Sequence, residues 1–207
     1  MAIYGKKNNN KKESIEIIIE EEDGYSNLEK LYLYLNNFGM NLHIPYEKLK
    51  TFTYNENGRN KVTLKFNKSN YIFKSLNEYN GNFISPLYLE TIHNIFNNKD
   101  KVPNLKIFNI KGRLTERINE DLYSNFIKLL LELENLENIE IIIEIIEIND
   151  VVEDDSDDDD IEKGFKSIKF RNYTEKELKD LFPNLNYQKY KSISISKLDS
   201  PIPTSIK

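Results

Sequence analysis

A short pattern that recurs along the chain constrains its fold most. The pattern begins with Asn-Leu, continues with two variable residues, and then places two apolar residues with one residue between them. Three clear copies start at Asn27, Asn104 and Asn135. Alternation of this kind predicts a strand with one buried face. Once looser copies at Leu49, Phe165 and Tyr190 are included, copies that follow one another directly start about twenty to thirty-one residues apart, so we expect similar units that stack and bury their apolar sides against one another.

The first copy carries the pattern furthest. It continues to Asn36 and Phe38, and this segment resembles the leucine-rich repeat family. Looser copies with the same spacing start at Leu49, Phe165 and Tyr190. The resemblance implies an α/β fold, an irregular leucine-rich-repeat-like solenoid of alternating strands and helices with a mainly parallel sheet. The alternative is a compact α/β or α+β domain in which the spacing is coincidental.

Residues 57–103 contain no clear copy of the pattern. This region is either a degenerate repeat or a hairpin insertion. In favour of a hairpin, Asn57-Gly58 is typical of a tight turn, and it lies between two strand candidates in the segment 49–67.

Three expected helices lie between the expected strands. Start signals for these helices occur at Ser85-Pro86, near Asn119 and at Thr174, where Thr174 and Glu177 have the spacing of a capping box. The strand candidates cover 14–20, 49–55, 61–67, 105–111, 139–148, 165–171 and 191–196. Alternation of strands and helices predicts α/β layering with mainly parallel strands.

Composition changes divide the chain into segments. We expect a disordered basic and polar tail at 1–13, a single leucine-rich-repeat-like domain at 14–200 and a flexible C-terminal tail at 201–207. Within the domain, 151–162 is expected to be an acidic disordered loop, because its run of like charges repels itself. Ser156 is followed directly by Asp157, Asp158 and Asp159 and is similar to the sites of acidophilic kinases, so it is a candidate for phosphorylation.

Residue counts exclude several kinds of chemistry. The chain has no cysteine and two histidines, which excludes disulfides, thiolate nucleophiles and the usual zinc sites. Its net charge of −5 does not favour a nucleic-acid partner. No apolar run approaches the roughly 18 residues that a membrane helix needs. We therefore expect a cytoplasmic protein with neither a nucleic-acid nor a membrane partner.

The search for catalytic motifs is negative. The seven glycines are scattered singly, so no phosphate-binding loop is expected, and no motif surrounds either histidine. The sequence predicts no metal and no cofactor. A non-enzymatic protein is the preferred interpretation, and an unrecognised enzyme that uses carboxylate acid–base chemistry is the alternative.

The strand residues that alternate with the apolar positions are expected to share one face. The candidates for partner binding on that face are Tyr32, Tyr34, Thr53, Asn109, Lys111, Glu140, Lys169 and Arg171. Tyrosine and arginine are enriched at protein interfaces. We therefore expect a scaffold that binds a protein partner, and the resemblance adds the possibility of a larger assembly such as a ubiquitin-ligase adaptor. The partner's identity and the oligomeric state stay open.

Overall fold

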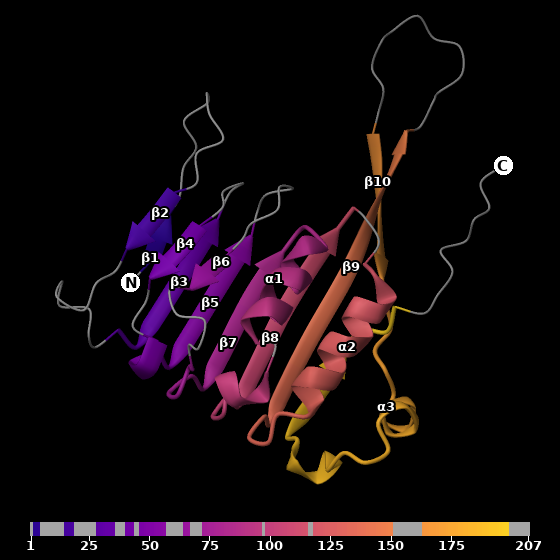
Figure 1. Ribbon diagram of the computed structural model, residues 1–207. Coiled ribbons are helices and arrows are strands. Elements are labelled where there is room, and N and C mark those ends of the chain that lie inside the picture. Colours follow the sequence, from indigo (N-terminus) through magenta and orange to yellow (C-terminus); the bar gives the residue numbers. More distant parts are fainter. Residues whose placement is uncertain are drawn as a thin grey trace, which may run out of the picture.

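The computed structural model describes two sheets and three α-helices (Figure 1). The described residues are 2–4, 15–18, 28–35, 40–43, 46–56, 64–66, 72–96, 98–115, 118–150 and 163–198. The larger sheet contains β1 (Ala2–Tyr4), β3 (Lys30–Leu35), β5 (Thr51–Glu56), β7 (Glu78–Phe83), β8 (Ile107–Leu114), β9 (Asn138–Asp150), β10 (Lys163–Lys169) and β11 (Ser192–Ile195).

Six strands of the larger sheet lie side by side in chain order. The order is β1-β3-β5-β7-β8-β9, and every neighbouring pair is parallel. Two strands share the remaining edge of β9, with β11 parallel to its first part and β10 antiparallel to its last part. The predicted α/β class with a mainly parallel sheet is therefore confirmed.

Other elements lie between these strands in the chain. The smaller sheet is parallel and contains β2 (Ile15–Ile18), β4 (Met40–His43) and β6 (Leu64–Phe66). The helices are α1 (Leu87–Ile95) after β7, α2 (Glu120–Leu131) after β8 and α3 (Glu175–Leu181) before β11. Short 3-10 turns are Tyr46–Lys48, Lys99–Lys101 and Tyr187–Lys189. Figure 1 shows α1 and α2 on the same face of the larger sheet.

One hydrogen-bond arrangement recurs at the start of the central strands. A single backbone carbonyl just before one strand accepts the amides of two successive residues at the start of the next strand, with N···O distances of 2.7–3.3 Å. The accepting carbonyls are those of Glu29, Lys50, Asn77, Lys106 and Glu137. The residue before each of these carbonyls is a buried leucine, namely Leu28, Leu49, Leu76, Leu105 and Leu136.

The asparagine of the recurring pattern has a structural purpose. Asn104 Nδ2 donates to the carbonyl of Lys74, and Asn135 Nδ2 donates to the carbonyl of Pro103, both at 2.7 Å. Each side chain thus bonds a backbone acceptor at the surface, in the turn before the neighbouring strand. The Asn-Leu pair therefore joins a surface hydrogen bond to a core contact.

Aromatic rings dominate the core between the sheet and the helices. Phe108 of β8 lies at the centre, fully buried. Its ring stacks on Tyr79 of β7 at 5.1 Å between centroids. It also meets the edges of Phe96 at 6.2 Å and Phe126 of α2 at 5.6 Å. Such pairs add to the free energy of simple area burial.

The structure bears on one of the two alternatives for residues 57–103. This region supplies β7, which pairs with β5 on one side and β8 on the other. The interpretation of 49–67 as a hairpin is wrong, because β5 and β6 lie in different sheets. The glycine in the middle of β7, Gly81, stands where a side chain has no room. A Cβ there would lie 1.7 Å from the hydroxyl of Tyr88 and 2.9 Å from the carbonyl of Tyr54.

Some expected segments are placed only in part. Residues 2–4, within the expected N-terminal tail, form β1, and the other residues of 1–13 lie outside the described ones. The acidic run 151–162 with Ser156 and the tail 201–207 also lie outside the described residues. The strand expected at 165–171 exists as β10, but it is antiparallel to β9.

Replacing Phe108 by Ala tests the aromatic core. We expect the free energy of unfolding to fall by about 3–5 kcal/mol, because three ring contacts are lost and a cavity remains. Ile107→Ala is the matched control, since Ile107 is next in the strand and faces the other side of the sheet. Urea unfolding followed by circular dichroism measures both variants, and equal losses would contradict the assignment of faces.

Candidate binding face

The outer face, the side of the larger sheet opposite α1 and α2, carries the side chains that alternate with the core. Strand register places them in rows that cross the sheet. The Tyr32 row contains Tyr32, Thr53, Asn80, Asn109, Glu140 and Ser194. The Tyr34 row contains Tyr34, Asn55, Asn82, Lys111 and Ile142. Every neighbouring pair in a row sits on adjacent parallel strands, so the side chains stand next to one another.

Six of the eight predicted binding residues fall in these two rows. The Tyr32 row includes Tyr32, Thr53, Asn109 and Glu140, and the Tyr34 row includes Tyr34 and Lys111. These residues come from four different strands and span 109 positions of the chain from Tyr32 to Glu140, counting both ends. The structure therefore brings together residues that the sequence linked only through their alternation.

Asparagine amides connect neighbouring strands on the outer face. Asn109 Nδ2 donates to Asn80 Oδ1 at 3.2 Å, and Asn82 Nδ2 donates to Asn55 Oδ1 at 3.1 Å. Asn80 Nδ2 in turn donates to the Glu78 carboxylate at 2.8 Å. These bonds fix the orientation of the amide groups in both rows.

Sequence reasoning missed Asn80 and Asn82 because it missed β7. Asparagine and glycine are disfavoured in strands, so the central residues of β7 concealed it. A partial signal was present nonetheless, since Leu76 and Tyr79 have the spacing of the pattern's first two apolar residues, although Gly81 stands where the third would be. Leu76 and Tyr79 are both buried.

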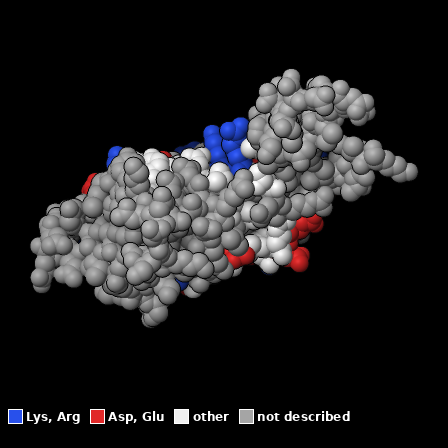
Figure 2. Space-filling model, turned by 90° about the horizontal axis from the view of Figure 1, so that it is seen from above, with Lys and Arg blue, Asp and Glu red and all other residues white. Residues whose placement is uncertain are grey.

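A groove opens where β7, β8 and β9 run toward their carboxyl ends. It has a volume of about 450 Å³ and is lined by Asn82, Phe83, Ile84, Lys111, Gly112, Arg113, Ile142 and Glu144. Lys111 Nζ lies 3.5 Å from Glu140 Oε2, and Arg113 Nε lies 3.4 Å from Glu144 Oε2. Figure 2 looks onto this end of the sheet, and Lys and Arg side chains gather at the upper edge of the visible surface, about halfway along its length.

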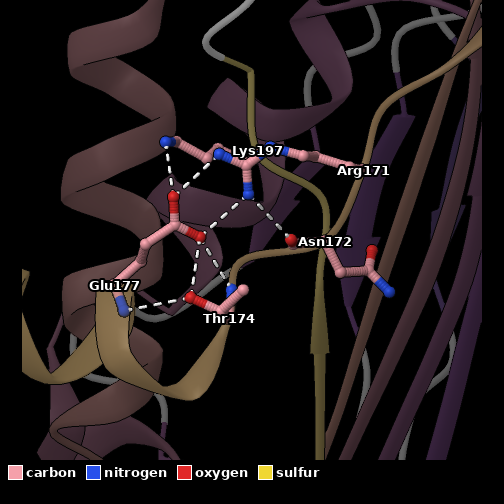
Figure 3. Close-up of polar contacts among 5 residues, drawn as sticks. All are labelled: Arg171, Asn172, Thr174, Glu177 and Lys197. Carbon is pink, nitrogen blue, oxygen red and sulfur yellow. Dashed lines mark hydrogen bonds and ion pairs between the residues drawn. The ribbon is translucent and has the colours of Figure 1, made fainter.

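Lys169 and Arg171 lie outside both rows. Lys169 pairs by register with Glu144 in the antiparallel part of β9, and its side chain is not among those described. Arg171 follows β10, and its guanidinium donates to both carboxylate oxygens of Glu177, at 2.8 and 2.7 Å (Figure 3). A bidentate pair of this kind has a fixed geometry. Arg171 therefore has a structural contact that the sequence did not reveal.

Glu177 is the centre of a polar network at the start of α3 (Figure 3). Besides Arg171, its carboxylate accepts from Lys197 Nζ at 2.8 Å and from the backbone amide of Thr174 at 2.9 Å. Thr174 Oγ1 accepts the amide of Glu177, which completes the predicted capping box. Arg171, followed by Lys197 and Thr174, holds the pKa of Glu177 well below its usual range.

Replacing Glu177 by Ala tests this network. We expect a lower melting temperature and faster amide hydrogen exchange in β11, because Glu177 joins the segment after β10, the start of α3 and the segment after β11. Glu175→Ala is the matched control, since Glu175 lies in the same helix turn with one exposed partner, Lys179. If the two variants exchange alike, the network has no structural role.

Glu56 is a carboxyl group enclosed in the core. Its residue has no exposed surface, Tyr54 Oη donates to Glu56 Oε2 at 3.2 Å, and Glu56 Oε1 has no hydrogen-bond partner among the described residues. Burial raises the pKa of Glu56 to about 7, although the bond from Tyr54 opposes that shift. Tyr79 and Tyr88 share a hydrogen bond at 2.7 Å beside it, and burial raises the pKa of both hydroxyls.

The raised pKa of Glu56 makes stability depend on pH. In the unfolded chain the carboxyl group loses its proton near pH 4.5, whereas in the folded protein it keeps the proton to about pH 7. The stabilisation is complete below pH 4.5 and is lost as the pH rises to about 7, by about 3 kcal/mol in total.

Glu56→Gln removes this titration. Relative to the native protein, we expect the variant to gain about 3 kcal/mol of unfolding free energy between about pH 4 and pH 8. Urea unfolding at several pH values measures the difference, and a difference that stays constant with pH would contradict the enclosed position of Glu56.

Comparison with known proteins adds no relative. Neither a protein-family model, nor a curated protein, nor a solved structure matches this chain. Among the described residues, no group of three His, Asp or Glu side chains is placed to hold a metal ion. Within the same part of the chain, no helix has both the length and the apolarity to cross a membrane.

Proposed function

We propose that this protein is a non-enzymatic scaffold that binds a protein partner on its outer face. The observation that carries the proposal is the Tyr32 row, in which a tyrosine, four uncharged polar residues and a glutamate cross six parallel strands in register. A surface built in this way offers one aromatic contact and several hydrogen-bonding groups to the same partner. Aromatic residues with adaptable polar neighbours are typical of protein interfaces.

We further propose that the fold is an irregular solenoid of the leucine-rich repeat kind. Two features support it: the strands follow chain order across the sheet, and the same double-accepting carbonyl recurs before the strands. The buried leucine at the same place in each unit is what stacking of similar units requires. Solenoids present extended surfaces, which suits a scaffold, and the proposed setting is the cytoplasm, with neither nucleic acid nor membrane as the partner.

Binding is favoured over carboxylate acid–base chemistry for a specific reason. The two carboxylates that line or adjoin the groove, those of Glu140 and Glu144, each face a cation. Each of these carboxylates is held in an ion pair within the sheet, whereas an acid–base catalyst has to hold a proton and pass it to a substrate. Glu56 does hold its proton, but it has no exposed surface with which to contact a substrate.

The combined variant Tyr32→Ala/Asn109→Ala tests the outer face. Affinity capture from cells followed by mass spectrometry should show at least about tenfold weaker capture of a specific partner, since hot-spot residues each contribute about 1–4 kcal/mol. Lys128→Ala/Glu132→Ala is the control, because both residues are exposed at the end of α2. Circular dichroism must show that all the proteins are folded. A folded double variant that keeps every partner at full strength would overturn the proposal.

A further inference from the structure

The groove beside the Tyr34 row arises because three neighbouring strands have different lengths. β7 ends at Phe83, which pairs with Gly112, whereas β8 continues to Leu114 and β9 to Asp150. Arg113 therefore has no register partner on β7. The step between the strands leaves the groove open on the outer face, with Phe83, Ile84 and Ile142 among its lining residues.

Two cations stand in this groove on the same strand. Lys111 and Arg113 are two residues apart in β8, so their side chains project from the same face. They are 56% and 68% exposed. Both are exposed, whereas Asn55, which shares the Tyr34 row with Lys111, is buried, as is Thr53 in the Tyr32 row.

The internal ion pairs leave these cations with unused hydrogen-bonding capacity. The contacts to Glu140 and Glu144 measure 3.5 and 3.4 Å, longer than the roughly 2.7–2.9 Å of a charge-assisted hydrogen bond. The guanidinium group carries five N–H donors, and its closest contact with Glu144 is that of Nε at 3.4 Å. An incoming carboxylate can therefore bind the outer nitrogens of Arg113 without breaking a strong bond.

Resting on the proposed function, we propose that this groove anchors a segment of the protein partner in which Asp or Glu stands next to an apolar residue. The carboxylate binds Lys111 and Arg113, and the apolar side chain packs against Ile84 and Ile142. About 450 Å³ is large enough for a short segment of side chains and small enough to select among them.

Charge favours a peptide over a nucleic acid as the occupant. Two cations suit one or two carboxylates, whereas a nucleic acid presents a continuous line of phosphates. Such a line would also meet Glu140 and Glu144, and the chain has a net charge of −5. Attraction in this groove is therefore local and short in range.

Selection from a library of random short peptides displayed on phage tests the anchor with the intact protein. We expect the selected peptides to be enriched in Asp or Glu beside an apolar residue. The affinity of one such peptide, measured by fluorescence anisotropy, should fall at least about tenfold in Lys111→Gln/Arg113→Gln and should weaken as salt increases.

Two further variants isolate the charge effect from any effect on folding. Lys50→Gln/Lys191→Gln removes the same charge from two exposed cations that are also paired with glutamates, so it should leave the affinity unchanged. Glu144→Gln removes the internal competitor for Arg113 and should tighten binding by about two- to fivefold.

The results that overturn the anchor differ from those that overturn the outer face. Selection without acidic peptides, equal binding by Lys111→Gln/Arg113→Gln, or tighter binding of a single-stranded oligonucleotide than of any peptide would each overturn the anchor. If Tyr32→Ala/Asn109→Ala still loses partners in those cases, the proposed function stands without it. If that variant keeps every partner, the proposed function fails whatever the peptides show.

Discussion

The rest of the structure depends on one repeated backbone interaction, the carbonyl that accepts two successive amides from the start of the next strand. It fixes where each strand begins relative to its neighbour, at Glu29, Lys50, Asn77, Lys106 and Glu137. Side chains alternate along a strand, so a shift of one residue would exchange the two faces. The same bonds therefore align Phe52, Tyr79 and Phe108 in the core and Thr53, Asn80 and Asn109 on the outer face.

The sequence predicted those strands and helices whose own residues have the pattern or the capping signal typical of the structure that they form. The pattern at Asn104 and Asn135 identified β8 and β9, and the capping box at Thr174 identified the start of α3. β7 was missed because Gly81 contradicts strand propensity, and the close approach of Tyr88 that explains it is a tertiary contact. Apolar alternation carries no information about strand direction, so the antiparallel pairing of β10 was also beyond reach.

The candidate site was predictable wherever the alternation of side chains along a strand determines which face each residue occupies. Tyr32, Thr53, Asn109 and Glu140 were identified one strand at a time, and parallel register was enough to place them in one row. Arg171 was chosen by the same rule, but it lies beyond the end of β10, where alternation no longer decides which way a side chain points. Its contact with Glu177 depends on α3, which begins four residues later at Glu175.

In the proposed function, the outer face combines two kinds of recognition at different places. In the middle of the sheet, amide–amide bonds such as that between Asn109 and Asn80 hold polar groups in fixed orientations, which lowers the entropy cost of binding a partner. At the step between β7 and β8, Lys111 and Arg113 are exposed and loosely paired, so they affect the rate of association and the choice of partner more than stability. β7 pairs with β8 only as far as Gly112, and this difference in strand length creates the step. The length of β7 relative to β8 therefore determines where Lys111 and Arg113 are exposed on this surface.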